Sequence, residues 1–170
     1  MPLKQTPQPY PLIDSDPHFS RVVRYMRPSD YATWAGATAI GPGLLYLYER
    51  VDPTKSTKAS IRSALRLTGF LGFAAGFMLA YQNSTFRFWG WKPNQPEIAK
   101  DQAELSARAA SGQPIYGETE LTPYLQGTAA RNSTWSQLKL HAIPWFNVAN
   151  HNVHGVDTSK YTSETPKQPS

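Results

Sequence analysis

The histidines near the C-terminal end are the residues whose type and spacing come closest to a metal site. His151 and His154 form a His-x-x-His pair, and His141 lies upstream of them. Imidazole nitrogens are common zinc ligands, but cysteine, the other frequent ligand of structural zinc, is absent from the chain. The pair also lies among asparagines and a glycine, which are typical of a loop. We therefore predict no metal site and expect these histidines to contact solvent or a partner protein.

Groups for catalysis do not come together elsewhere in the sequence. Glu118 and Glu120 lie beside Thr119 and Thr122, but this segment lacks a combination of nucleophile, base and orienting group. The glycines follow helical spacing instead of forming a phosphate-binding loop. Without cysteine, the chain cannot ligate an iron–sulfur cluster through thiolates. The sequence therefore predicts a protein that is not an enzyme, with no cofactor and no small-molecule substrate.

The elements that must carry any function are two apolar segments within a polar chain. The protein has 170 residues, of which 40% are hydrophobic, and a net charge of +5. Most of its 15 prolines and its charged residues lie outside the two segments, which is a poor basis for a single compact core. Basic residues gather beside the segments, as they do around membrane spans, and do not form a nucleic-acid-binding patch. These features predict an all-α membrane protein with a hairpin of two transmembrane helices, short surface helices and extended N- and C-terminal arms.

The segment 67–86 is the clearest candidate for a membrane-spanning helix. It has no charged residue between Arg66 and Arg87, and at about 1.5 Å per residue it is long enough to cross the hydrocarbon layer. Small residues recur at every fourth position along one face, where they let a second helix approach closely. The predicted helix-packing residues are Thr68, Gly72, Gly76, Ala80 and Ser84. The alternative is a buried helix of a soluble domain.

A shorter apolar segment, residues 31–48, is the expected first span of a hairpin that covers residues 31–86. It is uncharged between Asp30 and Glu49. The sequence Gly41-Pro42-Gly43 within it should kink the helix or unwind it locally. The alternative for this segment is a re-entrant or surface-lying helix.

The segment 49–66 between the two expected spans is short and basic. It carries five basic and two acidic residues, so its net charge is +3. A loop of this length forces a hairpin, with both termini on the same side of the membrane. The flanks of the hairpin carry a similar number of basic residues, so the orientation rests on the larger net charge of the loop. The positive-inside rule then predicts that the loop lies on the inner side and both termini on the outer side.

Residues 1–30 form the expected N-terminal arm, which begins as proline-rich extended chain. Asp16 and Pro17 are suited to begin a short amphipathic helix, as its N-cap and first residue. Arginines then recur at every third position, and aromatic and basic residues also follow the second span. The residues expected at the membrane surface, in contact with phospholipid such as cardiolipin, are Arg21, Arg24, Arg27, Trp89, Trp91 and Lys92. The alternative for the arginine helix is a solvated helix of a soluble domain.

Residues 87–170 form the expected C-terminal arm, with surface helices at about 97–111 and 128–141. Pro96 and Gly112 delimit the first of these helices. Its apolar face is thin, so we expect it to lie on a surface and not to form a core. The second helix should end before Pro144.

Three segments carry a resemblance to a known family. The N-terminal segment Tyr10 to Tyr31 reads YPLIDSDPHFSRVVRYMRPSDY. It resembles the opening signature of the fungal 21 kDa (20.9 kDa) accessory subunits of mitochondrial NADH:ubiquinone oxidoreductase, respiratory complex I. Two later segments, QGTAARNSTWSQLKLHAIPWFN and HGVDTSKY, resemble the C-terminal part of the same family.

This resemblance implies an accessory subunit of the complex I membrane arm in the mitochondrial inner membrane, with no redox centre and no catalytic residue. Its implied partners are other membrane-arm subunits, and its implied role is structural, in assembly and stability. In that compartment the basic loop would face the matrix and both termini the intermembrane space. A small membrane transport or channel component that self-associates through the glycine stripe is the alternative function.

Overall fold

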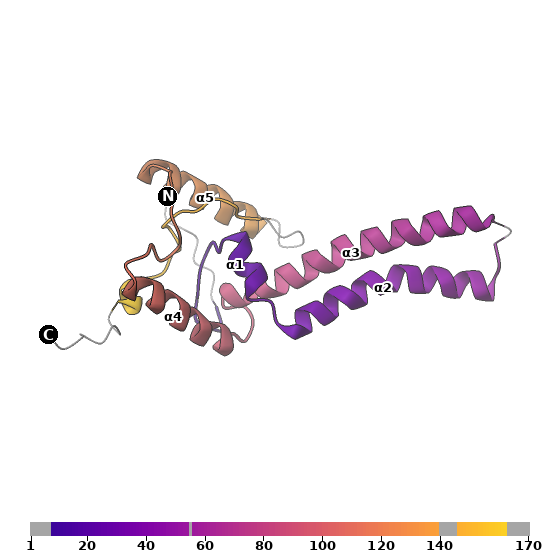
Figure 1. The fold of residues 1–170 in the computed structure, drawn as a ribbon, viewed down its shortest axis with the longest axis horizontal. Helices are drawn as coiled ribbons and strands as arrows, with labels where there is room; N and C mark the ends of the chain where they lie inside the picture. Colours follow the sequence, from indigo (N-terminus) through magenta and orange to yellow (C-terminus); the bar gives the residue numbers. More distant parts are fainter. Residues whose placement is uncertain (1–7, 55, 140–145, 163–170) are drawn as a thin grey trace. The chain divides into compact units, whose positions relative to one another are not determined.

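The computed structural model describes residues 8–54, 56–139 and 146–162, and these residues form helices without any strand. The elements, shown in Figure 1, are α1 (Phe19–Arg24), α2 (Pro28–Val51), α3 (Lys58–Phe88), α4 (Gln95–Ala110), α5 (Pro123–Lys139) and the short 3-10 helix η1 (Ser159–Tyr161). The predicted all-α class is confirmed for the described part of the chain.

The described chain divides into two compact units, each of which is considered by itself. The hairpin unit is Met26–Ser84, and the terminal unit combines Met1–Tyr25 with Thr85–Ser170. The first contains α2 and most of α3, and the second contains α1, α4, α5 and η1.

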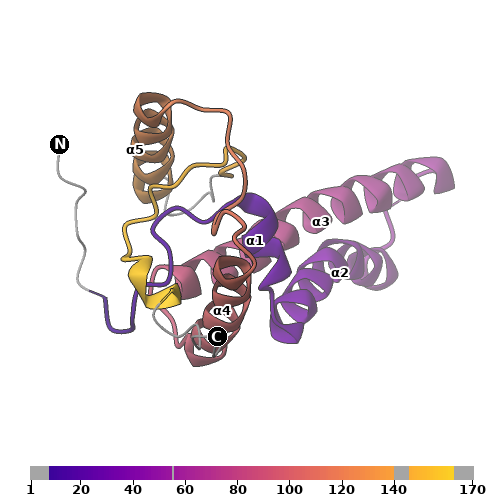
Figure 2. The same ribbon diagram turned by 60° about the vertical axis from the view of Figure 1, so that its left-hand side comes forward.

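Helices α2 and α3 form a helical hairpin in which small residues allow close contact. Both views show the two helices side by side (Figures 1 and 2). The indole Nε1 of Trp34 donates to the carbonyl oxygen of Phe73 at 2.9 Å. A Cβ built on Gly72 would lie 2.8 Å from the carbonyl oxygen of Ala37, closer than real Cβ atoms come. The chain stays helical through Pro42, so the local unwinding expected there is absent.

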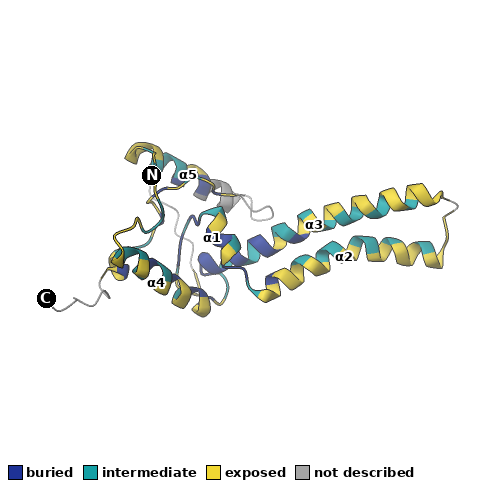
Figure 3. Cartoon of the chain, in the orientation of Figure 1, coloured by how far each residue is buried: buried dark blue, intermediate teal, exposed yellow. Residues whose placement is uncertain are grey.

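The two helices of the hairpin differ in length and apolar content. Among the described residues, α3 is the one helix that is long and apolar enough to cross a membrane. The core helix of a soluble protein can have the same length and composition. Helix α2 has 24 residues, but its glycines, threonines, tyrosines and internal proline lower its apolar content. Many apolar side chains on the two helices are exposed (Figure 3), among them Ile40, Leu44, Leu47, Phe70 and Leu71.

The terminal unit is organised around an irregular N-terminal segment, residues 10–18, fixed by backbone hydrogen bonds to two other parts of the unit. Ile13 donates to the carbonyl oxygen of Phe88 at 3.0 Å, and Ser15 donates to that of His154 at 3.0 Å. Gly90 has a φ of 72°, and a Cβ there would collide with the carbonyl oxygen of Tyr10. The two arms expected from the sequence therefore pack together as one compact body.

Helix α4 contributes to the core of this unit, contrary to the expectation that it lies only on a surface. Leu105 is 2% exposed, and Glu97 and Asp101 are buried beside it on the helix. The expectation was wrong because it considered only the apolar residues of α4. The buried face of the helix also contains Glu97, which pairs with Arg87, and Asp101, which pairs with Arg21 and Tyr161. The buried hydrophobic residues of the unit are Ile13, Val22, Tyr25, Phe88, Trp89, Leu105, Ala130 and Tyr161.

Helix α5 begins at Pro123, several residues before the predicted start near 128. Proline suits the first position of a helix, where its missing N–H is not needed. Thr122 precedes it, and its hydroxyl oxygen accepts from the backbone N–H of Leu125 at 3.4 Å. The end of the predicted helix 128–141 and His141 lie outside the described residues.

Candidate functional site

A buried ion cluster, consisting of Asp14, Asp16, Arg21, Asp101, His151 and His154, lies in the terminal unit. Arg21 of α1 has a side chain that is only 8% exposed. Its Nη1 donates to Oδ2 of Asp14 at 2.6 Å, and its Nη2 donates to Oδ1 of Asp101 on α4. Oδ2 of Asp101 also accepts from the hydroxyl of Tyr161 at 2.6 Å. Arg21 thus joins the N-terminal segment to α4, and Asp101 extends this connection to η1.

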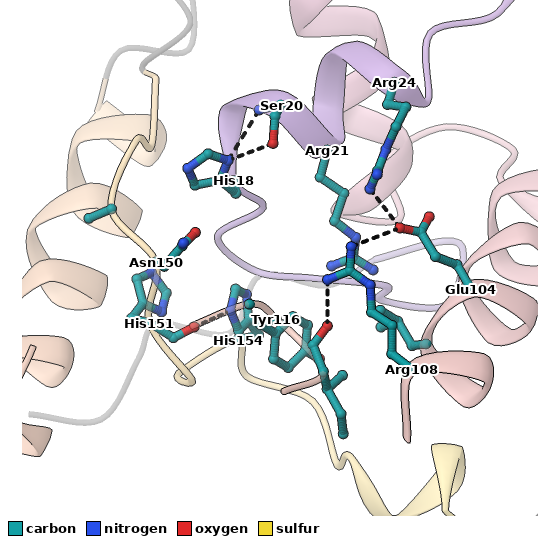
Figure 4. A pocket seen from close by; sticks show the side chains of 14 residues that line it. His18, Ser20, Arg21, Arg24, Glu104, Arg108, Tyr116, Asn150, His151 and His154 are labelled. Atoms are coloured by element: carbon teal, nitrogen blue, oxygen red, sulfur yellow. Dashed lines mark hydrogen bonds and ion pairs between the residues drawn. The ribbon is translucent and has the colours of Figure 1, made fainter. Parts of the chain in front are cut away.

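The hydrogen bonds of His154 define its charge. Its Nδ1 lies 2.8 Å from Oδ1 of Asp14. Its Nε2 lies 2.6 Å from the carbonyl oxygen of His151 (Figure 4). A carbonyl oxygen can only accept, so Nε2 carries a hydrogen. Because a carboxylate accepts from Nδ1, both ring nitrogens are donors and the ring of His154 is a cation.

His151 has a different role in the same cluster. Its Nδ1 accepts from the backbone N–H of Val153 at 3.2 Å, so the proton lies on Nε2. Nε2 then donates to Oδ2 of Asp16 at 2.8 Å. The other carboxylate oxygen of Asp16 accepts from the hydroxyl of Ser133 at 2.8 Å. His151 therefore serves as a neutral donor that connects the C-terminal segment to the N-terminal one.

The cluster shifts the pKa values of its acidic and basic groups. Burial alone would raise the pKa of Asp14, but the adjacent His154 and Arg21 outweigh burial and lower it. Burial alone would lower the pKa of His154, but the Asp14 carboxylate outweighs it and raises that pKa. Burial raises the pKa of Asp16, and hydrogen bonds from His151 and Ser133 only partly oppose this. Asp14 and His154 therefore form an ion pair, and the Asp14 carboxylate forms a second ion pair with Arg21.

These positions correct two expectations, which concern Arg21, His151 and His154. Arg21 does not point toward membrane phosphates, because its guanidinium is buried against two carboxylates. His151 and His154 do not face solvent or a partner protein, since both are buried and paired with aspartates. The sequence gives complementary residue types here, but Asp14 and His154 are 140 residues apart, so their pairing could not be read from spacing.

The other residues predicted at the membrane surface have mixed positions. The side chain of Arg24 is 52% exposed and bonds to Glu104 at 2.6 Å. Arg27 precedes α2, and its backbone N–H donates to Oδ2 of Asp30 at 2.8 Å. Trp89 is buried and does not present its ring to a surface, whereas Trp91 and Lys92 are partly exposed. The structure therefore does not gather the six predicted residues on one exposed face.

Three of the predicted helix-packing residues lie against α2. Thr68 is opposite Gly41, at which an added Cβ would lie 3.2 Å from the Thr68 Cβ. An added Cβ at Gly76 would lie 2.7 Å from the carbonyl oxygen of Trp34. Gly72 makes the equivalent close approach to Ala37 described above. Ala80 and Ser84, further along α3, are fully buried.

The buried ion cluster is a set of charged groups that pair with one another. In the ranges that the structure describes, no group of three or more histidine, aspartate or glutamate side chains is positioned to hold a metal ion. The charged groups of the buried ion cluster are engaged with one another. Its ion pairs hold together three parts of the chain that are distant in sequence: the N-terminal segment with α1, helix α4, and the C-terminal segment that contains His154.

A substitution of His154 by glutamine should remove a contribution to stability that depends on pH. The raised pKa of His154 stabilises the fold fully below its ordinary value of 6.5, and this contribution is lost as pH rises through the folded value. The lowered pKa of Asp14 stabilises above 3.8 and is lost as pH falls through the folded value. The ion pair of Asp14 and His154 therefore contributes most to the free energy of unfolding between pH 3.8 and pH 6.5, the ordinary pKa values of the two groups.

Chemical denaturation of the wild type and the His154→Gln variant checks this expectation. The difference in free energy of unfolding should be larger at pH about 5.5 than at pH about 9. His18→Gln is the control, because His18 lies in the same unit and, among the described residues, its ring bonds to the neighbouring Ser20 and to no carboxylate. An equal loss for His154→Gln at both pH values would contradict the assigned charge.

Comparisons with known proteins match nearly the whole chain. The family model described as NADH-ubiquinone oxidoreductase complex I, 21 kDa subunit, matches residues 7–93. The model for the C-terminal part of the NADH-ubiquinone oxidoreductase 21 kDa subunit matches residues 102–169. The NADH-ubiquinone oxidoreductase 20.9 kDa subunit of Neurospora crassa is 46% identical over 159 residues, which cover 94% of this chain and 84% of that protein.

Proposed function

Because this chain belongs to the family of the 21 kDa subunit of NADH-ubiquinone oxidoreductase, complex I, we propose that it is an accessory subunit of that complex. The observation that carries the proposal is the 46% identity with the Neurospora 20.9 kDa subunit over 94% of the chain. A subunit of complex I has other subunits of the complex as partners and resides in the mitochondrial inner membrane. Both properties follow for this chain from the proposed membership.

The proposed role is structural and non-catalytic, in the assembly and stability of the membrane arm. The buried ion cluster supports it, because its charged groups pair with each other. The unit also exposes apolar side chains that a neighbouring subunit could cover, among them Tyr124 at 77% and Val148 at 74% exposure. Such a surface is expected of a subunit that connects others.

We further propose that α2 and α3 are both transmembrane helices. The exposed apolar side chains of the hairpin support this, since they would be costly to hydrate and would be covered by lipid. Arg24, which is exposed, and Trp91 and Lys92, which are partly exposed, are the residues proposed to contact an anionic phospholipid such as cardiolipin at the membrane surface. Membership in a family of complex I subunits also supports a place in a membrane complex.

Native gel electrophoresis of mitochondria tests the proposed membership. A tagged copy of the chain, expressed in its own organism, should migrate with the assembly that has NADH dehydrogenase activity. Deleting the gene should lower the amount of that assembly. A tagged chain that migrates only as a small homo-oligomer would contradict this function and favour a self-associating transport or channel component.

Protease protection tests the proposed orientation, in which the loop 49–66 faces the matrix and both termini face the intermembrane space. The reason is the net charge of +3 on the loop. Protease added to mitoplasts should remove a tag placed after Ser170 and spare a cleavage site introduced at Lys58. A C-terminal tag that resists protease until detergent is added would reverse the orientation. Cleavage of a tag at only one terminus would contradict the hairpin.

A further inference from the structure

A pocket of about 220 Å³ lies beside the buried ion cluster, entirely within the terminal unit. It is lined by residues of the N-terminal segment, α1, α4, the loop after α4 and the segment 149–154. Figure 4 shows the side chains of His18, Arg21, Arg24 and Arg108 around it, together with a carboxylate, Glu104. The polar lining is therefore dominated by hydrogen-bond donors.

The two partly exposed arginines have more donors than their protein partners use. Nη2 of Arg24 donates to Oε1 of Glu104 at 2.6 Å. Arg108 donates from Nη1 to the carbonyl oxygen of Ile115 at 3.5 Å, and its Nη2 lies 3.7 Å from the same Glu104 oxygen. A guanidinium has five N–H donors, so within the described part of the chain each arginine has more donors than these contacts use.

Two further groups add donors to the same lining. The Nε of Arg21 is buried and has no hydrogen-bond partner among the described residues, although its two Nη atoms are paired. A buried N–H without an acceptor is costly, so a ligand oxygen would relieve that cost. Nδ1 of His18 accepts from the backbone N–H of Ser20 at 3.2 Å, so the ring proton of neutral His18 lies on Nε2.

We propose that this pocket binds a phosphate group through Arg24, Arg108 and His18, with Arg21 at its buried side. Arginine donors in a fixed planar geometry are suited to phosphate oxygens, which only accept when ionised. The volume is below the ~300–1,000 Å³ of pockets for drug-sized ligands, which limits the ligand to a small group. The phosphate can come from a soluble phosphate monoester or from a phospholipid headgroup. This binding site is independent of membership in complex I.

Calorimetric titration of the purified full chain in detergent tests the site and separates the two sources. The probes are inorganic phosphate, glycerol 3-phosphate and short-chain phosphatidic acid, with glycerol as the probe that lacks phosphate. At least one phosphate probe should bind with a Kd below about 1 mM, and glycerol should not bind. Binding of the two soluble probes identifies a soluble ligand, whereas binding of phosphatidic acid alone identifies a lipid headgroup.

Variants localise the binding. The double variant Arg24→Gln, Arg108→Gln should bind phosphate at least about tenfold more weakly, because it loses charge-assisted hydrogen bonds. Arg131→Gln removes an exposed arginine on α5 that does not line the pocket, and it should bind normally. Ala149→Leu fills the pocket without changing charge and should also weaken binding, which gives a second measurement if the arginine variants unfold. Absence of binding by every phosphate probe, or unchanged binding by the double variant and by Ala149→Leu, would overturn the proposal.

Discussion

Replacing Asp14 with alanine is expected to lower the free energy of unfolding of the terminal unit by about 3–5 kcal/mol, the usual cost of breaking a buried charge pair. Asp14 is fully buried and accepts hydrogen bonds from both Arg21 and His154. It also accepts from the backbone N–H of Asp16 at 2.9 Å. The variant would leave the cation of His154 without its carboxylate in a site from which water is excluded.

Hydrogen exchange resolved by peptide is the appropriate measurement, because it reports on one unit of the full chain. In the Asp14→Ala variant, protection should fall in the peptides that cover residues 10–25 and 147–161. Glu120→Ala is the control, since Glu120 is an exposed carboxylate in the same unit. Protection that changes no more in Asp14→Ala than in Glu120→Ala would show that the buried ion cluster does not hold these segments together.

Replacing both Gly72 and Gly76 with leucine should separate α2 from α3 and reduce the amount of assembled complex severalfold. A Cβ at either position would collide with a backbone carbonyl oxygen of α2, and a backbone cannot move aside as a side chain can. Overpacking typically costs about 1–3 kcal/mol at each site. Gly72 and Gly76 both lie on the face of α3 where small residues let α2 approach closely. The helices can relieve the collision only by moving apart.

Native gels of mitochondria that carry the double variant measure this effect. Gly36→Leu is a matched control, because a Cβ at Gly36 meets no atom within 4 Å. The control also places leucine at a glycine of a helix, so it isolates the effect of close packing from the general effect of a larger side chain. Normal levels of the assembly in the double variant would exclude this face as a packing surface.

The sequence by itself determined the helical class, the approximate extent of four of the helices and the family resemblance. These properties depend on local patterns, which are visible without the fold. Apolar stretches without charge predicted the two long helices, and proline and glycine marked the ends of α4. The four-residue spacing of Gly72 and Gly76 is also a local pattern, because helix geometry alone places such residues in line, and an added Cβ at either glycine would meet the backbone of α2.

Only the tertiary structure decided what the charged residues of the two arms do. Arg21 and Asp101 are 80 residues apart, and Asp16 and His151 are 135 residues apart. An arginine at helical spacing has the same local pattern whether it faces lipid phosphates or a buried carboxylate. Burial decides between these roles, since a charge removed from water must find an opposite charge. In this chain, packing of the N-terminal segment against α4 and residues 147–161 supplies those partners, so residues expected at a surface became the centre of the terminal unit.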